Sequence, residues 1–87
     1  RVTEPNSGRG IEIYTTQPGV QLYTANGLDG GIVGKSGIAY PKYGDFCLET
    51  QNWPDAIHHE NFPNSILRPG DTYNQTTVYK LLVYNAK

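Results

Sequence analysis

The chain has 87 residues, which is enough for one small domain, and only 37% of them are hydrophobic. A stable core is difficult to build from so few apolar side chains. The sequence therefore predicts either a marginal independent domain or a part of a larger protein. Seven Lys and Arg against eight Asp and Glu give a net charge of −1. This charge excludes bulk electrostatic attraction to a polyanion, so nucleic acid is not expected as a partner.

Cysteine content and apolar run length exclude further classes. Cys47 is the only cysteine, so neither an internal disulfide nor a multi-cysteine zinc site is possible within the chain. A lone thiol fits a reducing compartment, and we expect a cytoplasmic protein. The longest apolar runs, such as residues 81–83, are far shorter than the roughly 20 residues that span a bilayer, so no membrane partner is expected.

The first half of the chain predicts short strands separated by turns. Residues 1–10 are polar and are interpreted as a linker or turn. Alternating apolar and polar residues predict a strand over 10–15, and a second such run predicts another over 20–24. Because Gln, Pro and Gly at 17–19 separate the two runs, we predict that they form a hairpin.

The second half continues the pattern, and no helix of ordinary length is predicted. Glycines recur through 25–42, which indicates a long irregular loop with at most short strands. Residues 45–51 predict a strand that ends in polar side chains, and 52–65 predict another loop. After an extended piece at 66–68, the Thr-, Val- and Tyr-rich segment 72–84 predicts the last strand. The fold class is therefore all-β.

Residues 29–36 superficially resemble a phosphate-binding loop, which requires Gly, four residues and then Gly-Lys-Ser or Gly-Lys-Thr. Asp29 stands at the first glycine position, where its carboxylate would face the phosphates. Gly37 and Pro41 follow where a helix should begin. We therefore reject a nucleotide site.

The adjacent His58 and His59, with Asp55 and Glu60 close by, suggest a metal site. On extended backbone, however, neighbouring side chains point to opposite sides, so one ion would rarely take both imidazoles. We favour two solvated loop histidines and expect no metal.

Glu49 is the strongest catalytic candidate that the residues themselves suggest. It ends an apolar strand beside Thr50 and Gln51, and such a carboxylate has the burial and the neighbours that a general base requires. The alternative is an ordinary surface or salt-bridged glutamate. Trp53 and the seven tyrosines hint at sugar binding through flat aromatic faces, although most of these tyrosines also suit ordinary strand positions.

Several segments then match a known family in chain order. They are PGVQLYTAN at 18–26, FCLETQ at 46–51, PD at 54–55, NFP at 61–63 and ILRPGDTY at 66–73. Together they closely resemble the C-terminal part of the aldose 1-epimerases, also called galactose mutarotases. Two departures are Asp71, where many relatives have Glu, and the loop at 56–60, which follows no pattern of the family.

The resemblance implies that residues 1–87 are the C-terminal portion of one larger domain, a galactose-mutarotase-like β-supersandwich, whose remainder is absent from this chain. It implies an enzyme that interconverts the α and β anomers of hexoses such as galactose and glucose by acid/base ring opening. No cofactor and no metal are implied. The expected partners are a monosaccharide substrate and the N-terminal remainder of the same protein.

The family's site residues are carried over by position. Glu49 falls on the catalytic glutamate, which removes the proton from the C1 hydroxyl of the sugar. Gln21 falls on a position that contacts sugar hydroxyls, and Tyr23 and Asn26 in the same motif are further substrate-binding candidates. The family's general acid is a histidine far upstream, outside this chain. We therefore predict that these 87 residues alone do not catalyse.

Two other functions remain open at this point. A family relative could bind a carbohydrate or a sugar phosphate without turnover. Alternatively, the chain could be a small independent β-domain with a structural or interaction role.

Overall fold

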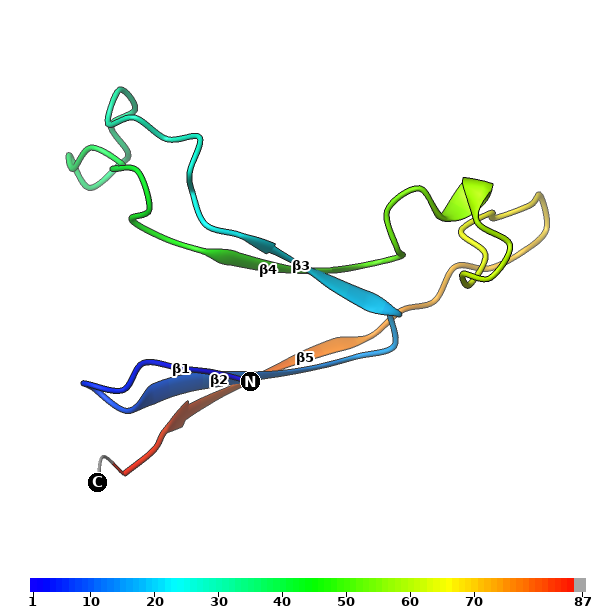
Figure 1. Cartoon of the computed structure of the whole chain (residues 1–87), viewed down its shortest axis with the longest axis horizontal. Coiled ribbons are helices and arrows are strands. Elements are labelled where there is room, and N and C mark those ends of the chain that lie inside the picture. Colours follow the sequence, from blue (N-terminus) through cyan, green and yellow to red (C-terminus); the bar gives the residue numbers. More distant parts are fainter. Residues whose placement is uncertain (86–87) are drawn as a thin grey trace. The chain divides into compact units, whose positions relative to one another are not determined.

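The computed structural model describes residues 1–85, which belong to two compact units. One unit contains residues 1–18 together with those from 52 onward, and the other contains residues 19–51 (Figure 1). Strands dominate both, and the only helical element among the described residues is the single 3-10 turn η1 (Ala56–His58). The all-β prediction is confirmed. None of the described helical segments has the length and apolar content needed to cross a membrane.

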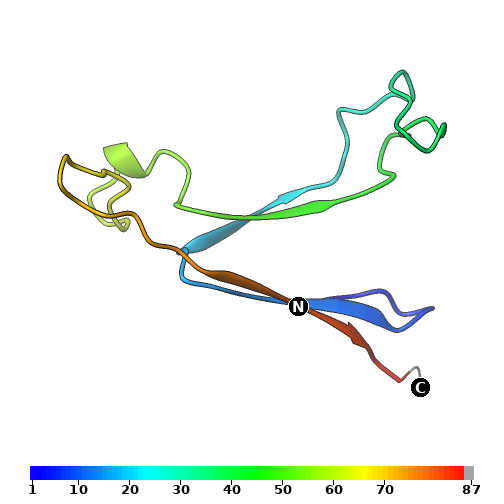
Figure 2. The same ribbon diagram turned by 180° about the vertical axis from the view of Figure 1, so that it is seen from behind.

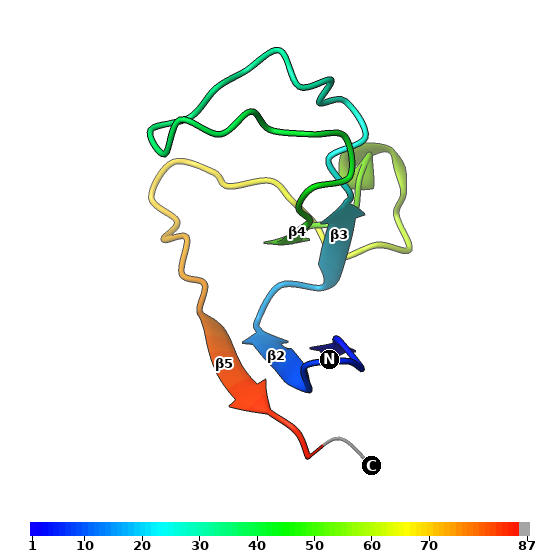
Figure 3. The same ribbon diagram turned by 90° about the vertical axis from the view of Figure 1, so that its left-hand side faces the viewer.

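The first unit is built on a three-stranded antiparallel sheet with the order β1-β2-β5. Its strands are β1 (Val2–Thr3), β2 (Arg9–Thr15) and β5 (Thr77–Val83), and β2 and β5 run side by side in opposite directions (Figure 3). The interpretation of residues 1–10 as a linker or turn is only partly right, because β1 and the start of β2 form a hairpin across them.

The predicted hairpin between the two strand runs on either side of Pro18 is wrong. β2 pairs along all its seven residues with β5, whereas β3 (Gly19–Tyr23) pairs with β4 (Cys47–Gln51) in a separate two-stranded sheet. The two runs have equally good strand patterns, but each pairs with a strand that is distant in the sequence. The β2 pairing is extended beyond the strands by the Thr16 N–H, which donates to the Thr76 carbonyl at 3.1 Å.

The second unit is a long hairpin, with β3 and β4 joined by residues 24–46 (Figure 2). The predicted irregular loop is confirmed over most of this segment, which folds back on itself through backbone hydrogen bonds. Tyr43 N–H donates to the Ala25 carbonyl at 3.1 Å, and Tyr40 N–H donates to Ile32 at 2.9 Å. Ala25 has a left-handed φ of 57° and is almost completely buried at the base of the loop.

Little of the apolar surface is covered within the described chain. Ala25 and Ala56 are the only buried hydrophobic residues among residues 1–85, and no large side chain is fully buried there. On β5, Leu81 and Val83 remain 79% and 77% exposed although they share one face of the strand. The shortage of core that the composition predicts is therefore present in the structure.

The side chains of the first sheet meet instead in a polar cluster around Glu12. The hydroxyl of Tyr84 donates to one carboxylate oxygen at 2.7 Å, that of Tyr14 donates to the other, and the Arg1 guanidinium lies 3.1 Å from the first. Gly10 makes room for this arrangement, since a Cβ there would lie 2.4 Å from the Tyr84 ring. The cluster ties the first and last described segments of this unit to the central strand.

This cluster predicts a specific acid sensitivity. The hydrogen bonds from Tyr14 and Tyr84 lower the pKa of Glu12 from 4.5 to about 2. Because the pKa is depressed in the folded state, the ionised carboxylate contributes its full stabilisation above about pH 4.5, and this is lost as the pH falls toward 2. Glu4 behaves alike, because hydrogen bonds from the Ser7 hydroxyl and from the N–H groups of Asn6 and Ser7 lower its pKa to about 2.

We expect Glu12→Gln to flatten the decline of stability with acid. The thermal midpoint of the protein, measured from pH 6 to pH 2, should fall less steeply in the variant than in the parent. Glu4→Gln is the matched comparison, because its carboxylate has the same lowered pKa but accepts only from a local turn. Identical slopes for Glu12→Gln and the parent would refute the role of this cluster.

Candidate functional site

The pairing of β3 with β4 places the predicted base beside a predicted sugar contact. Gln21 lies directly opposite Glu49 in the antiparallel register. Residues directly opposite in such a ladder have Cβ atoms about 4.5–5.5 Å apart and point to the same face. Two residues separated by 28 positions in the sequence therefore share one small patch of surface.

Alternation along the two strands divides the ladder into two unlike faces. The face that carries Glu49, here called the site face, consists of Gly19, Gln21, Tyr23, Cys47, Glu49 and Gln51. The opposite face carries Val20, Leu22, Leu48 and Thr50. Polar groups suited to binding hydroxyls thus collect on the first face, while three of the four side chains on the second are aliphatic.

Glu49 is exposed on the site face, and its carboxylate has no hydrogen-bond or ion-pair partner within residues 1–85. The Gln21 carboxamide makes one long contact, in which Nε2 donates to the Leu22 carbonyl at 3.4 Å. Both groups are consequently available to a ligand. A free carboxylate beside an amide can accept a proton from a hydroxyl that the amide helps to orient.

The other two predicted contacts are placed differently. Tyr23 lies on the site face opposite Cys47, with 39% of its surface exposed. Asn26 lies outside the ladder, in the exposed turn that follows Ala25. The structure thus groups Gln21, Tyr23 and Glu49 on one face and does not bring Asn26 onto it.

Gln51 also lies on the site face, although the sequence reasoning gave it only a supporting place next to Glu49. The period of two along β4 is the signal that would have identified it, because residues 49 and 51 must point to the same side. Its partner across the ladder is Gly19, which has no side chain.

Both histidines are exposed, as expected of solvated loop imidazoles, but the prediction of an extended backbone that would point them to opposite sides is wrong. Residues 56–58 form η1, so the chain turns, and both rings reach one carboxylate. His58 Nδ1 lies 2.5 Å from Asp55 Oδ1, and His59 Nε2 lies 3.2 Å from Asp55 Oδ2. The rings remain 74% and 47% exposed. The Asp-x-x-His-His spacing was the available signal.

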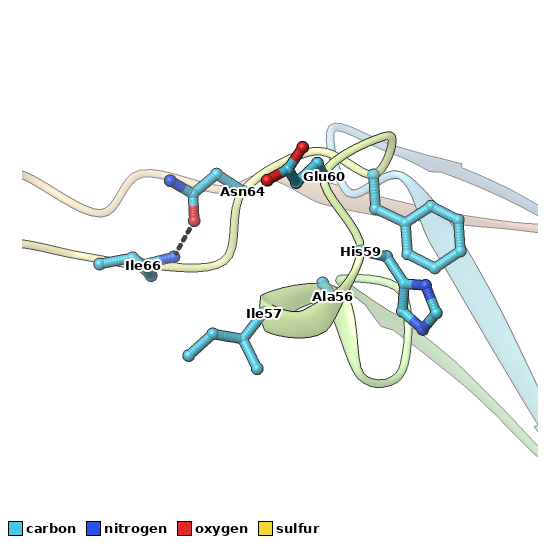
Figure 4. Close-up of a pocket in the computed structure, with 7 residues that line it drawn as sticks. Ala56, Ile57, His59, Glu60, Asn64 and Ile66 are labelled. Carbon is cyan, nitrogen blue, oxygen red and sulfur yellow. Dashed lines mark hydrogen bonds between the residues drawn. The ribbon is translucent and has the colours of Figure 1, made fainter.

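A shallow pocket lies beside this turn, lined by Ile57, His59, Glu60, Asn64 and Ile66 among others (Figure 4). The Phe62 ring lies 4.9 Å from the His59 ring and 6.3 Å from Trp53, measured between centroids. Trp53 is thus partly engaged in aromatic packing, which weakens its interpretation as a sugar platform. Within residues 1–85, no group of three or more His, Cys, Asp or Glu side chains could hold a metal ion.

Comparisons with known proteins give consistent matches. A model of the aldose 1-epimerase family matches residues 1–80. The galactose mutarotases of Rattus norvegicus and Homo sapiens are 60% and 58% identical over 83 residues, which cover 95% of this chain and 24% of each relative. The aldose 1-epimerase of Escherichia coli (strain K12) is 32% identical over 74 residues, 83% of this chain and 21% of the relative. The chain thus spans about a quarter of the length of these relatives.

Proposed function

The chain belongs to the aldose 1-epimerase family, and we propose that it forms the C-terminal part of an enzyme that interconverts the α and β anomers of a free hexose. The observation that supports this proposal most directly is the unpaired Glu49 carboxylate opposite Gln21 on the site face. Glu49 is the general base in this proposal. Gln21 and Tyr23 bind the sugar, and Asn26 approaches it from the turn that follows β3.

The chemistry requires only the movement of protons. Glu49 removes the proton from the C1 hydroxyl, the C1–O5 bond breaks as C1 becomes a carbonyl, and the ring oxygen takes a proton from a general acid. Rotation about the C1–C2 bond turns the other face of the carbonyl toward O5. Ring closure then reverses the proton transfers, so both groups return to their starting states and the opposite anomer is formed.

In this proposal the general acid comes from outside this chain. No imidazole is present on the site face, and both histidines of the chain contact Asp55. We propose that the remainder of a single larger domain supplies a histidine acid, as the family resemblance implies, and covers the exposed apolar side chains of β5. The partners in this proposal are a monosaccharide and that remainder, in a cytoplasmic protein. The names of the relatives favour galactose as one substrate.

Polarimetry on a full-length protein carrying this segment tests the proposal. Fresh α-galactose or α-glucose should reach its equilibrium rotation much faster with the protein than in buffer alone. The buffer without protein is the control for spontaneous mutarotation. A protein that binds galactose in calorimetry without accelerating the change in rotation would instead be a non-catalytic carbohydrate binder, and the enzymatic proposal would be wrong.

A further inference from the structure

Gln51 is the one carboxamide of the site face that has no role in the proposed reaction. It is the last residue of β4 and lies two positions after Glu49, so its side chain leaves the strand on the same side. Side chains two apart on an antiparallel strand are separated by about 7 Å. That separation is similar to the width of a pyranose ring.

No side chain of β3 competes for the Gln51 carboxamide. Its ladder partner Gly19 is buried and contributes no side chain, whereas Gln21 stands opposite Glu49. At the other end of the ladder, Tyr23 and Cys47 face each other. Of the three side chains that β4 contributes to the site face, only that of Gln51 therefore has no side chain directly opposite it on β3.

The chemistry of Gln51 fits a sugar hydroxyl. A carboxamide can donate and accept at once, as a hydroxyl can, and it carries no charge that would need a counterion. Gln51 is half-buried, and no hydrogen bond links its amide to any other group in residues 1–85. A half-buried amide without a partner gains from a hydroxyl that approaches it, because an unmade hydrogen bond is costly.

From these positions we infer that Gln51 is a substrate-binding residue that contacts a ring hydroxyl remote from C1, on the C3–C4 side of the sugar. Glu49 and Gln21 then hold the reacting end of the ring, while Gln51 holds the far end and contributes to discrimination between hexose epimers. Galactose and glucose differ only in the orientation of the C4 hydroxyl, so this contact bears directly on the choice between them. The inference rests on the proposed mutarotase function.

The test uses Gln51→Ala in the full-length protein, with galactose, 3-deoxygalactose and 4-deoxygalactose as substrates in polarimetry. We expect kcat/KM for galactose to fall about tenfold, mainly through KM, because one neutral hydrogen bond made equally in the ground and transition states is lost. The parent protein should lose about as much with the deoxy sugar that lacks the contacted hydroxyl. With that sugar, Gln51→Ala should cause no further loss.

Two further variants separate binding from folding. Gln51→Asn keeps the carboxamide but shortens its reach, and it should show the same pattern of losses in a protein with the parent's thermal midpoint. Gln75→Ala removes a carboxamide from the other unit and should leave the kinetics with all three sugars unchanged.

The outcomes distinguish this inference from the proposed function. If the parent protein does not accelerate mutarotation, both fail. If the parent is active and Gln51→Ala keeps its kcat/KM, or loses the same factor with all three sugars, only the inference is overturned. The ring then extends toward Tyr23, or Gln51 has a structural role.

Discussion

Glu49→Gln is expected to lower kcat for galactose mutarotation by about 10²–10⁴-fold, which is the usual contribution of a positioned general base. The amide has nearly the shape of the carboxylate, so the β3–β4 pairing and the approach of the sugar should be preserved. What it lacks is the capacity to take the C1 proton. KM should consequently change little compared with kcat, because the lost interaction belongs to the transition state.

Polarimetry at saturating galactose measures the effect, and Glu60→Gln is its matched control. Glu60 is also an exposed glutamate, but it lies in the other unit beside η1 and has no part in the proposed reaction. Its replacement should leave kcat within about twofold of the parent, as expected for a surface substitution of less than about 0.5 kcal/mol. If Glu49→Gln kept more than a tenth of the parent's kcat, another group would have to be the base.

The isolated 87-residue chain is expected to show no detectable mutarotase activity and no cooperative unfolding transition. The proposed base would have no imidazole acid opposite it, so ring opening would lack the proton that the ring oxygen needs. Within residues 1–85, Ala25 and Ala56 are the only hydrophobic residues that are buried. So small a core cannot offset the conformational entropy of ordering a chain of this length.

Circular dichroism during a urea titration, together with polarimetry on the same sample, measures both expectations. The full-length protein at equal molar concentration is the control, and it should give a sigmoidal transition and rapid mutarotation. A sharp two-state transition in the isolated chain would show that it is an independent small domain. Mutarotation at the rate of the full-length protein would show that the acid lies within these residues.

Local pattern predicted four of the five strands, missed β1, began the last strand at residue 72 instead of Thr77, and did not predict the pairing partners. Alternating residues located β2 and β3 to within one residue, because the period of two depends only on neighbouring side chains. The choice between β3 and β5 as the partner of β2 depends on contacts more than 60 residues away, such as the hydrogen bond between the Thr15 and Thr77 hydroxyls. A turn-forming Pro-Gly pair was not sufficient evidence for a hairpin.

For the candidate site too, the sequence predicted individual residues but not which of them lie together. The strand pattern and the motif resemblance both gave Glu49, and the resemblance alone gave Gln21, but only the strand register reveals that they face each other. Gln51 needed both the period along β4 and the identity of its partner Gly19. The shared contact of both histidines with Asp55 was not predicted, because a short 3-10 turn after a left-handed Asp55 has no periodic signature in the sequence.

The register of the β3–β4 pairing decides which face of the ladder carries Glu49. Because successive side chains alternate between faces, sliding β4 by one residue against β3 would still allow hydrogen bonding, yet it would bring Leu48 or Thr50 opposite Gln21 and send Glu49 to the other side. Residues 24–46 can lengthen or shorten at the small cost of loop closure, whereas a single residue added within Cys47–Gln51 would invert the face that the base occupies. A shift of β4 by an odd number of residues would therefore remove Glu49 from the site face, whereas a shift by an even number would keep it there.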